Sequence, residues 1–179
     1  MFNLHDKVVY PGLGVARVNR IIEKSVGNTK ITLYELKFIH KDMVILVPTN
    51  NSDSIGLREL TTRDQIDTIF DFLARPARRF KNHELTSSNW NRRCKDYQLK
   101  LMSGNLEDVS FIYRELKNLA KYKELSFGEK NMLNQTEVLL VQEIAAVKNL
   151  AEEKAVAYIR SIFDTNFDLK HSGGQQQLC

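Results

Sequence analysis

The side chains best placed to bind a polyanion lie in one segment, Ser87-Ser88-Asn89-Trp90-Asn91-Arg92-Arg93-Cys94-Lys95. It holds the only tryptophan of the chain, followed within five residues by three cations. Arg and Lys side chains bind DNA phosphates or enter a minor groove. A large apolar ring beside them can press against a base step, as apolar side chains of minor-groove binders do. The segment therefore predicts DNA contact through Trp90, Arg92, Arg93 and Lys95.

A structural role for the same helix is an open alternative. Trp90, Cys94, Tyr97 and Leu101 are spaced four, three and four residues apart, which is the pattern of a buried helical stripe. A tryptophan in the first turn of a helix can pack its inner edge against a core and expose the rest. The two interpretations are therefore compatible.

The charge distribution supports a polyanionic partner. The chain of 179 residues carries a formal net charge of +4, and residues 61–100 hold nine basic against five acidic side chains. Within residues 75–100 alone, eight basic side chains face only Glu84 and Asp96. A local excess of this kind is the electrostatic footprint of a nucleic-acid-binding surface, although a solvated basic face has the same composition.

Signatures of catalysis and of cofactor binding are missing from the sequence. Gly12-Leu13-Gly14 lies between expected strands and reads as a turn, and no P-loop or GxSxG elbow occurs. Cys94 and Cys179 fit neither a disulfide framework nor a zinc pattern, and the four histidines are scattered. No apolar run approaches the ~18 residues of a membrane span. We expect a cytoplasmic, monomeric, non-enzymatic protein without metal or cofactor.

The elements that must position these residues divide the chain near residue 60. Residues 6–60 alternate apolar and polar side chains in five short segments, with turn signals at 11–14, 27–28 and 40–42, which predicts a small antiparallel barrel. From Thr61 the period becomes helical. Capping boxes at Thr62/Gln65 and Ser126/Glu129 open two of about five expected helices.

The predicted fold is therefore α+β by chain: a small antiparallel β-barrel followed by an all-α domain of about five helices. The expected bounds are 1–60 for the barrel, 61–167 for the helical domain and 168–179 for a disordered tail. Residues 75–86 are expected to form an irregular connection between two helices.

Several motifs, in order and at consistent spacing over residues 3–160, resemble the CarD/CdnL family of transcription regulators. They are Lys7-Val8-Val9-Tyr10-Pro11 with Gly14, Val47-Pro48, Ser54-Ile55-Gly56-Leu57-Arg58, Asn89-Trp90-x-Arg92-Arg93, Ser103-Gly104 and Leu125-Ser126-x-Gly128-Glu129-Lys130-x-Met132-Leu133. The resemblance implies that the N-terminal barrel is a Tudor-like domain that binds the β subunit of RNA polymerase. It also implies a helical domain whose tryptophan, here Trp90, presses into the minor groove at the upstream edge of the promoter bubble and stabilises the open complex.

The resemblance further places polymerase contacts at Lys24, Leu46, Val47 and Pro48, and DNA contacts of low sequence specificity at Arg92, Arg93 and Lys95. Leu46 stands where some members carry a second basic polymerase contact, so docking there is expected to be weaker or to rely on strand pairing. Two other functions stay open: a free-standing basic DNA-binding protein, and a protein-interaction module. The module would need an aromatic cage, for which Tyr10, Tyr34 and Phe38 are the candidates.

Overall fold

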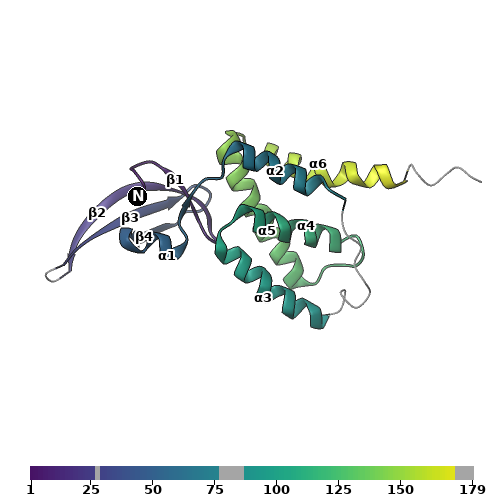
Figure 1. The fold of residues 1–179 in the computed structure, drawn as a ribbon, viewed down its shortest axis with the longest axis horizontal. Helices are drawn as coiled ribbons and strands as arrows, with labels where there is room; N and C mark the ends of the chain where they lie inside the picture. The colour runs from purple at the N-terminus through teal and green to yellow at the C-terminus, as the bar shows by residue number, and fades with distance from the viewer. Residues whose placement is uncertain (27–28, 77–86, 172–179) are drawn as a thin grey trace, which may run out of the picture.

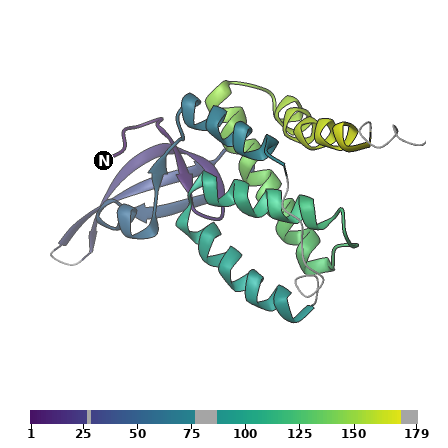
Figure 2. The same cartoon turned by 45° about the vertical axis from the view of Figure 1, so that its right-hand side comes forward.

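The computed structural model describes residues 1–26, 29–76 and 87–171 as a sheet followed by a group of helices (Figure 1). The strands lie within residues 7–59 and the helices after them within residues 63–171. In two views the sheet occupies one end of the molecule and the helices the other (Figure 2). The predicted change from strand to helix periodicity near Thr61 is confirmed.

Five antiparallel strands form the sheet, in the order β4-β3-β2-β1-β5. Their bounds are Lys7–Tyr10 (β1), Gly14–Val26 (β2), Thr29–Phe38 (β3), Val44–Pro48 (β4) and Arg58–Glu59 (β5). A 3-10 turn, Thr49–Asn51, and the short helix α1, Ser52–Ile55, connect β4 to β5. The β1–β2 turn has positive φ at Gly12 and Gly14, which glycine adopts without the strain of a side chain.

The sheet is open, which corrects the expected closed barrel. β4 and β5 are its two edges, and no strand pairing among the described residues joins them. β5 is only two residues long, so it offers too few backbone groups to close the ring. Leu57 and the half-buried Ile55, on the connection between β4 and β5, pack against the core of the sheet. The core is thus enclosed by a loop and a short helix, and closure is not needed to bury it.

The sheet buries one continuous apolar cluster on its inner face, made of Val8, Ala16, Val18, Tyr34, Leu36, Phe38, Val47 and Leu57. Tyr34 and Phe38, two candidates for an aromatic cage, are only 2% and 3% exposed. Tyr10 packs edge-to-face on Phe38, with ring centroids 6.1 Å apart. These rings therefore serve the core, and they form no open cage for a cationic ligand.

Five helices follow the sheet in the described part of the chain: α2 Arg63–Ala74, α3 Ser87–Ser103, α4 Leu106–Leu119, α5 Phe127–Lys148 and α6 Glu152–His171. Both predicted capping boxes are confirmed. The Thr62 side chain accepts from the Gln65 amide, and the Ser126 side chain accepts from the Glu129 amide, each with the reciprocal bond present. Gly104, with a φ of 71°, follows the last residue of α3 as expected.

The longest helix, α5, lies at the centre of the helical domain. It contacts α2, α4 and α6 and also reaches strand β2. Its fully buried Leu140 and Ile144 join a core that includes Ile69, Ile112, Tyr113, Leu116 and Ile159. Because α5 touches both the helices and the sheet, it fixes the position of one domain relative to the other.

The expected boundaries agree with these elements in part. α6 extends to His171, four residues into the segment expected to be a disordered tail, while residues 172–179 lie outside the described residues. Most of the expected irregular connection, residues 77–86, also lies outside them.

Candidate nucleic-acid interface

Helix α3 places the four predicted DNA contacts in its first half. Arg92 and Lys95 are exposed, while Trp90 is partly buried and packs against the helical core. The Arg93 side chain is only 15% exposed. Arg92 and Lys95 follow Trp90 by two and five residues, so they lie on a different face of α3 from the indole, while Arg93, three residues after Trp90, is turned inward.

The indole of Trp90 rests on two supports. Its ring meets Tyr97 edge-to-face, with centroids 6.4 Å apart and an interplanar angle of 65°. Its other contact is Gly128 on α5: a Cβ built there would lie 3.3 Å from both Cζ2 and Nε1 of the indole. The expected packing of Trp90 on the core is therefore confirmed, and because the residue is only partly buried, its contact with DNA stays a prediction.

Gly128 is a residue that sequence reasoning used only as part of a motif. The contact explains why glycine suits this position, since a methyl group would press on Trp90 at a spacing tighter than ordinary packing. The signal that could have found it is the unusual glycine in the first turn of a helix. The position of the indole thus depends on a backbone surface 38 residues further along the chain.

Arg93 forms an ion pair with Glu129, at 3.2 Å between Nη2 and Oε1. Glu129 is fully buried in the first turn of α5. It also accepts two hydrogen bonds from Lys123 Nζ, at 2.9 and 2.8 Å, and one from the Ser126 amide at 2.8 Å. Burial acts to raise the pKa of Glu129, but the hydrogen bonds from Lys123 and Ser126 outweigh it and hold the pKa below its usual value. The carboxylate therefore joins α3 to the α4–α5 turn.

The sheet carries the second set of predicted contacts. Lys24 on β2 lies opposite Ile31, and Leu46 on β4 lies opposite Glu35. Residues 31 and 35 are separated by an even number along β3, so Lys24 and Leu46 share one face of the sheet, roughly 13 Å apart along the strand direction. This outer face faces away from the buried cluster.

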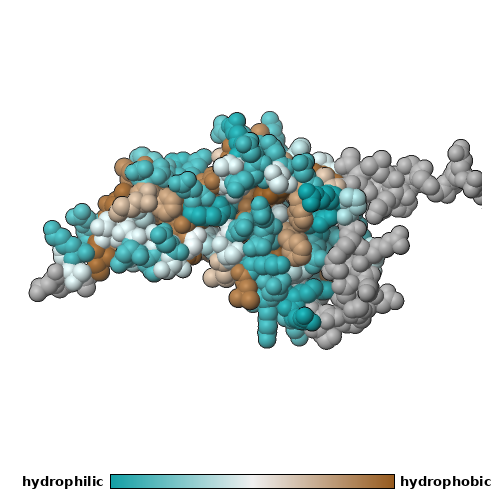
Figure 3. Space-filling view, viewed as in Figure 1, coloured by the Kyte–Doolittle hydropathy of each residue, from teal (hydrophilic) through white to brown (hydrophobic). Residues whose placement is uncertain are grey.

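The four sheet residues differ in what they offer to a partner. Lys24 is exposed, Leu46 is 44% exposed and Pro48 is half-buried. Val47 is 1% exposed and points into the core opposite Tyr34. The Phe38 amide bonds to the Met43 carbonyl and hydrogen-bonded pairs alternate along antiparallel strands, so the backbone of Val47 bonds to Tyr34 and that of Leu46 points outward from the edge. Sequence reasoning missed Val44, which is 52% exposed on the same edge strand. Brown, apolar surface is visible over the sheet among hydrophilic side chains (Figure 3).

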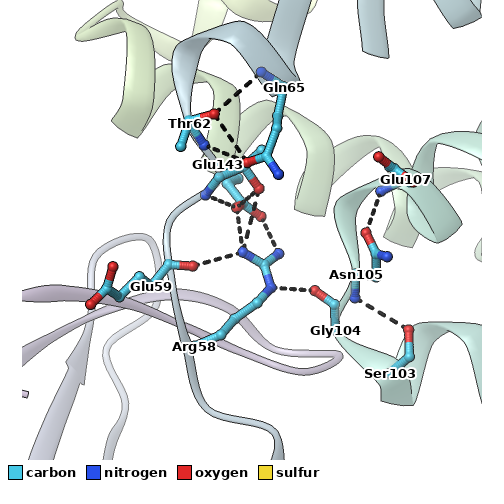
Figure 4. A network of polar contacts seen from close by, with 10 residues as sticks. Arg58, Glu59, Thr62, Gln65, Ser103, Gly104, Asn105, Glu107 and Glu143 are labelled. Carbon is cyan, nitrogen blue, oxygen red and sulfur yellow. Dashed lines mark hydrogen bonds and ion pairs between the residues drawn. The ribbon is translucent and has the colours of Figure 1, made fainter. Parts of the chain in front are cut away.

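A buried ion pair joins the two domains (Figure 4). Both terminal nitrogens of Arg58, in β5, donate to the carboxylate of Glu143, in α5, at 2.7 and 2.8 Å. Thr61 adds its amide at 2.9 Å and its hydroxyl at 2.6 Å to the same carboxylate. Arg58 Nε donates to the Gly104 carbonyl at 2.7 Å. Glu143 is 2% exposed, and neither spacing nor composition singled it out.

Close backbone approaches complete the junction. A Cβ at Gly104 would lie 2.9 Å from the Pro11 ring, and one at Gly14 would collide with the Gln142 side chain. His40, between β3 and β4, pairs with Glu152 in the first turn of α6. The domains are thus held at several separated points, which resists rotation about any one of them.

The junction and the indole lie at opposite ends of α3 and α5. Gly104 and Glu143 are at or towards the C-terminal ends of these helices, whereas Trp90 and Gly128 are in their first turns. α3 has 17 residues and α5 has 22, so their lengths are about 25 and 33 Å. The helical domain therefore holds the indole at a fixed distance from the sheet.

The structure thus defines a two-domain protein, in which an open antiparallel sheet is locked to a helical domain that carries Trp90 at its far end. The family model described as "CarD-like/TRCF RID domain" matches residues 2–61 of the chain, and the model described as "CarD, C-terminal domain" matches residues 73–160. The chain belongs to the CarD family of transcription factors.

A curated relative supports the same family. The chain is 24% identical over 159 residues to "Putative transcription factor YdeB" of Bacillus subtilis (strain 168), over 88% of this chain and 99% of that protein. Within the described residues, no helix combines the length and apolarity needed to cross a membrane. No group of three or more His, Cys, Asp or Glu side chains there is arranged for a metal ion.

Proposed function

We propose that this chain regulates transcription initiation by binding the RNA polymerase β subunit through its sheet domain and promoter DNA through its helical domain. The match to the RID domain supports the first contact. The observation that carries the second is the partly buried Trp90, packed on Gly128 near the start of a helix that also exposes Arg92 and Lys95. The protein acts as a monomer and uses no cofactor.

On the DNA, the exposed part of the indole enters the minor groove at the upstream edge of the bubble, and Arg92 and Lys95 contact phosphates. Arg93 acts through its ion pair with Glu129, which orients the first turn of α3. Contacts of these kinds depend on groove shape and phosphate position more than on base edges. Sequence specificity is therefore low, and binding to polymerase brings the factor to promoters by raising its local concentration.

The mechanism is differential binding. A factor that contacts the melted promoter better than the closed one shifts the equilibrium toward melting. A coupling free energy of about 1–3 kcal/mol changes the open-to-closed ratio about five- to 150-fold. This magnitude suits a regulator that adjusts initiation without driving it.

On polymerase, the outer face of the sheet supplies Lys24, Leu46 and Pro48 as side-chain contacts. β4 is an edge strand, and the backbone groups that point outward at Leu46, next to Val47, can pair with a strand of the β subunit. The exposed Val44 and Leu46 add apolar area where a basic contact is absent.

The test has two parts. Co-purification with polymerase and with the isolated β subunit checks the anchor, and the lifetime of the open complex with and without the protein checks the effect on DNA. Trp90→Ala should keep polymerase binding and lose the change in lifetime. Wild-type protein that fails to bind polymerase would favour a free-standing DNA-binding protein, whereas an unchanged lifetime with Trp90→Ala would remove the indole from the mechanism.

A further inference from the structure

The N-terminal end of α5 exposes a second large aromatic ring next to the support of Trp90. Phe127, the first residue of α5, is 81% exposed, the largest value among the exposed aromatic side chains of the described residues. Its neighbour in the chain is Gly128, on which the indole rests. Consecutive Cα atoms are about 3.8 Å apart, so the Cα of Phe127 lies that far from the Cα of Gly128, the residue against which Trp90 packs.

The exposure of Phe127 has no role in folding that we can identify. It packs against neither hydrophobic core, and it occupies the first helical position, where the capping box is completed by Ser126 and Glu129. A single exposed apolar side chain is ordinary on a protein surface. Phe127 differs from such a residue because it directly precedes Gly128, against which Trp90 packs, so both large aromatic side chains lie near the same glycine.

The charges around the two rings favour a polyanion as the occupant. Arg92 lies exposed on the α3 side of the pair. On the α5 side, Lys130 is three residues after Phe127, one helical turn away, and its side chain is 52% exposed. Lys130 pairs at 2.8 Å with Glu124, which is 88% exposed, and an ion pair this open is weak enough to exchange for a phosphate.

We infer that Phe127 is a second DNA-contacting residue, which stacks on or packs against an unpaired base beside the site of Trp90. The inference rests on the proposed function and extends it to the opposite helix. Base–aromatic stacking tolerates any sequence, because every base presents a π face. A second ring would therefore strengthen binding to melted DNA over duplex DNA without adding specificity.

Fork-junction DNA, with a duplex and an unpaired strand, and fully paired DNA of the same sequence test the inference by fluorescence anisotropy. Phe127→Ala should weaken binding to the fork about fivefold or more and change duplex binding much less. Phe127→Leu, which keeps apolar volume and loses the ring, should recover binding only in part. Val138→Ala is the matched control, because Val138 is 47% exposed on the same helix, roughly 16 Å further along.

The outcomes separate this inference from the proposed function. If Trp90→Ala weakens fork binding and Phe127→Ala behaves like Val138→Ala, Phe127 is no DNA contact and the proposed function stands. If neither aromatic variant changes fork binding or open-complex lifetime, the DNA part of the proposed function fails and the inference falls with it. Equal losses on fork and duplex DNA would also overturn it, because stacking on an unpaired base requires a difference. Thermal unfolding should be unchanged in Phe127→Ala.

Discussion

The guanidinium of Arg58, in the last strand of the sheet, and the carboxylate of Glu143, towards the C-terminal end of α5, share two parallel hydrogen bonds of 2.7 and 2.8 Å. We expect Arg58→Ala to lower the free energy of unfolding by about 3–5 kcal/mol, because it leaves Glu143 buried and charged without its partner. Urea denaturation followed by circular dichroism measures the loss.

The double variant Arg58→Met/Glu143→Leu is the control for this pair. Replacing both charges by apolar side chains of similar size should recover much of the stability, since buried ion pairs contribute little over well-packed hydrophobic residues. A single Arg58→Ala variant as stable as the wild type would show that the pair is dispensable to the junction. If the double variant folds but no longer alters open-complex lifetime, fixed domain geometry is required for function.

We expect the three cations among the predicted DNA contacts, Arg92, Arg93 and Lys95, to differ in role according to their burial. Arg92→Ala and Lys95→Ala together should reduce the slope of log affinity against log salt by about 1.8, or about 0.9 per phosphate contact, with no change in fold. Arg93→Ala should instead lower the free energy of unfolding, because the buried Glu129 loses one of its cations. Salt titrations of DNA binding and urea denaturation distinguish the two classes. A salt slope that is unaltered in the first variant would make Arg92 and Lys95 a solvated face.

Polymerase binding should depend on the apolar edge of the sheet. Leu46→Glu places a charge on the outer face of the edge strand β4, where Leu46 is 44% exposed, and should weaken β-subunit binding about tenfold or more without unfolding the sheet. Ile39→Glu is the matched control, since Ile39 is 40% exposed just after β3 and lies outside the proposed contact. Surface plasmon resonance with the immobilised β subunit measures both. Equal affinities for the two variants would exclude the β4 edge from the interface.

Local features of the fold could be predicted from sequence, because their partners are close in the chain. The capping boxes of α2 and α5 join residues three apart, and the turn at Gly104 depends on one residue's φ. The prediction of a closed barrel was wrong. Closure depends on whether the two edge strands meet, and the alternation of apolar and polar residues within each strand carries no information about that. The length of β5 decided the outcome.

The predicted site shows the same limit. Arg92 and Arg93 are neighbours with identical chemistry, and only the distant Glu129 separates an exposed cation from a buried one. Arg58 and Glu143 are 85 residues apart, so no local pattern could pair them. The partial burial of Trp90 was anticipated from its place in the first turn, but its contact with Gly128 was not.

The buried Glu129 gives the stability of the helical domain a defined pH dependence. Its pKa in the folded state lies below the ordinary value of 4.5, so the folded protein favours the ionised carboxylate. The stabilisation is present above about pH 4.5 and is lost as the pH falls through the lower pKa of the folded state. Glu129→Gln should therefore be less stable than the wild type at pH 7, and the difference should shrink as the pH is lowered below 4.5.

Urea denaturation at pH 7, 5, 4 and 3 measures this difference, with Glu153→Gln, at an exposed position of α6, as the control for removing a carboxylate. The control should match the wild type throughout the series. A gap between Glu129→Gln and the wild type that stays constant to pH 3 would mean that Glu129 stabilises the α3–α5 contact by shape and hydrogen bonding. If the stability difference between Glu129→Gln and the wild type disappears at low pH, the negative charge of Glu129 is what stabilises this contact. Its ion pairs with Arg93 and Lys123 would then hold the start of α3, and with it Trp90, in place.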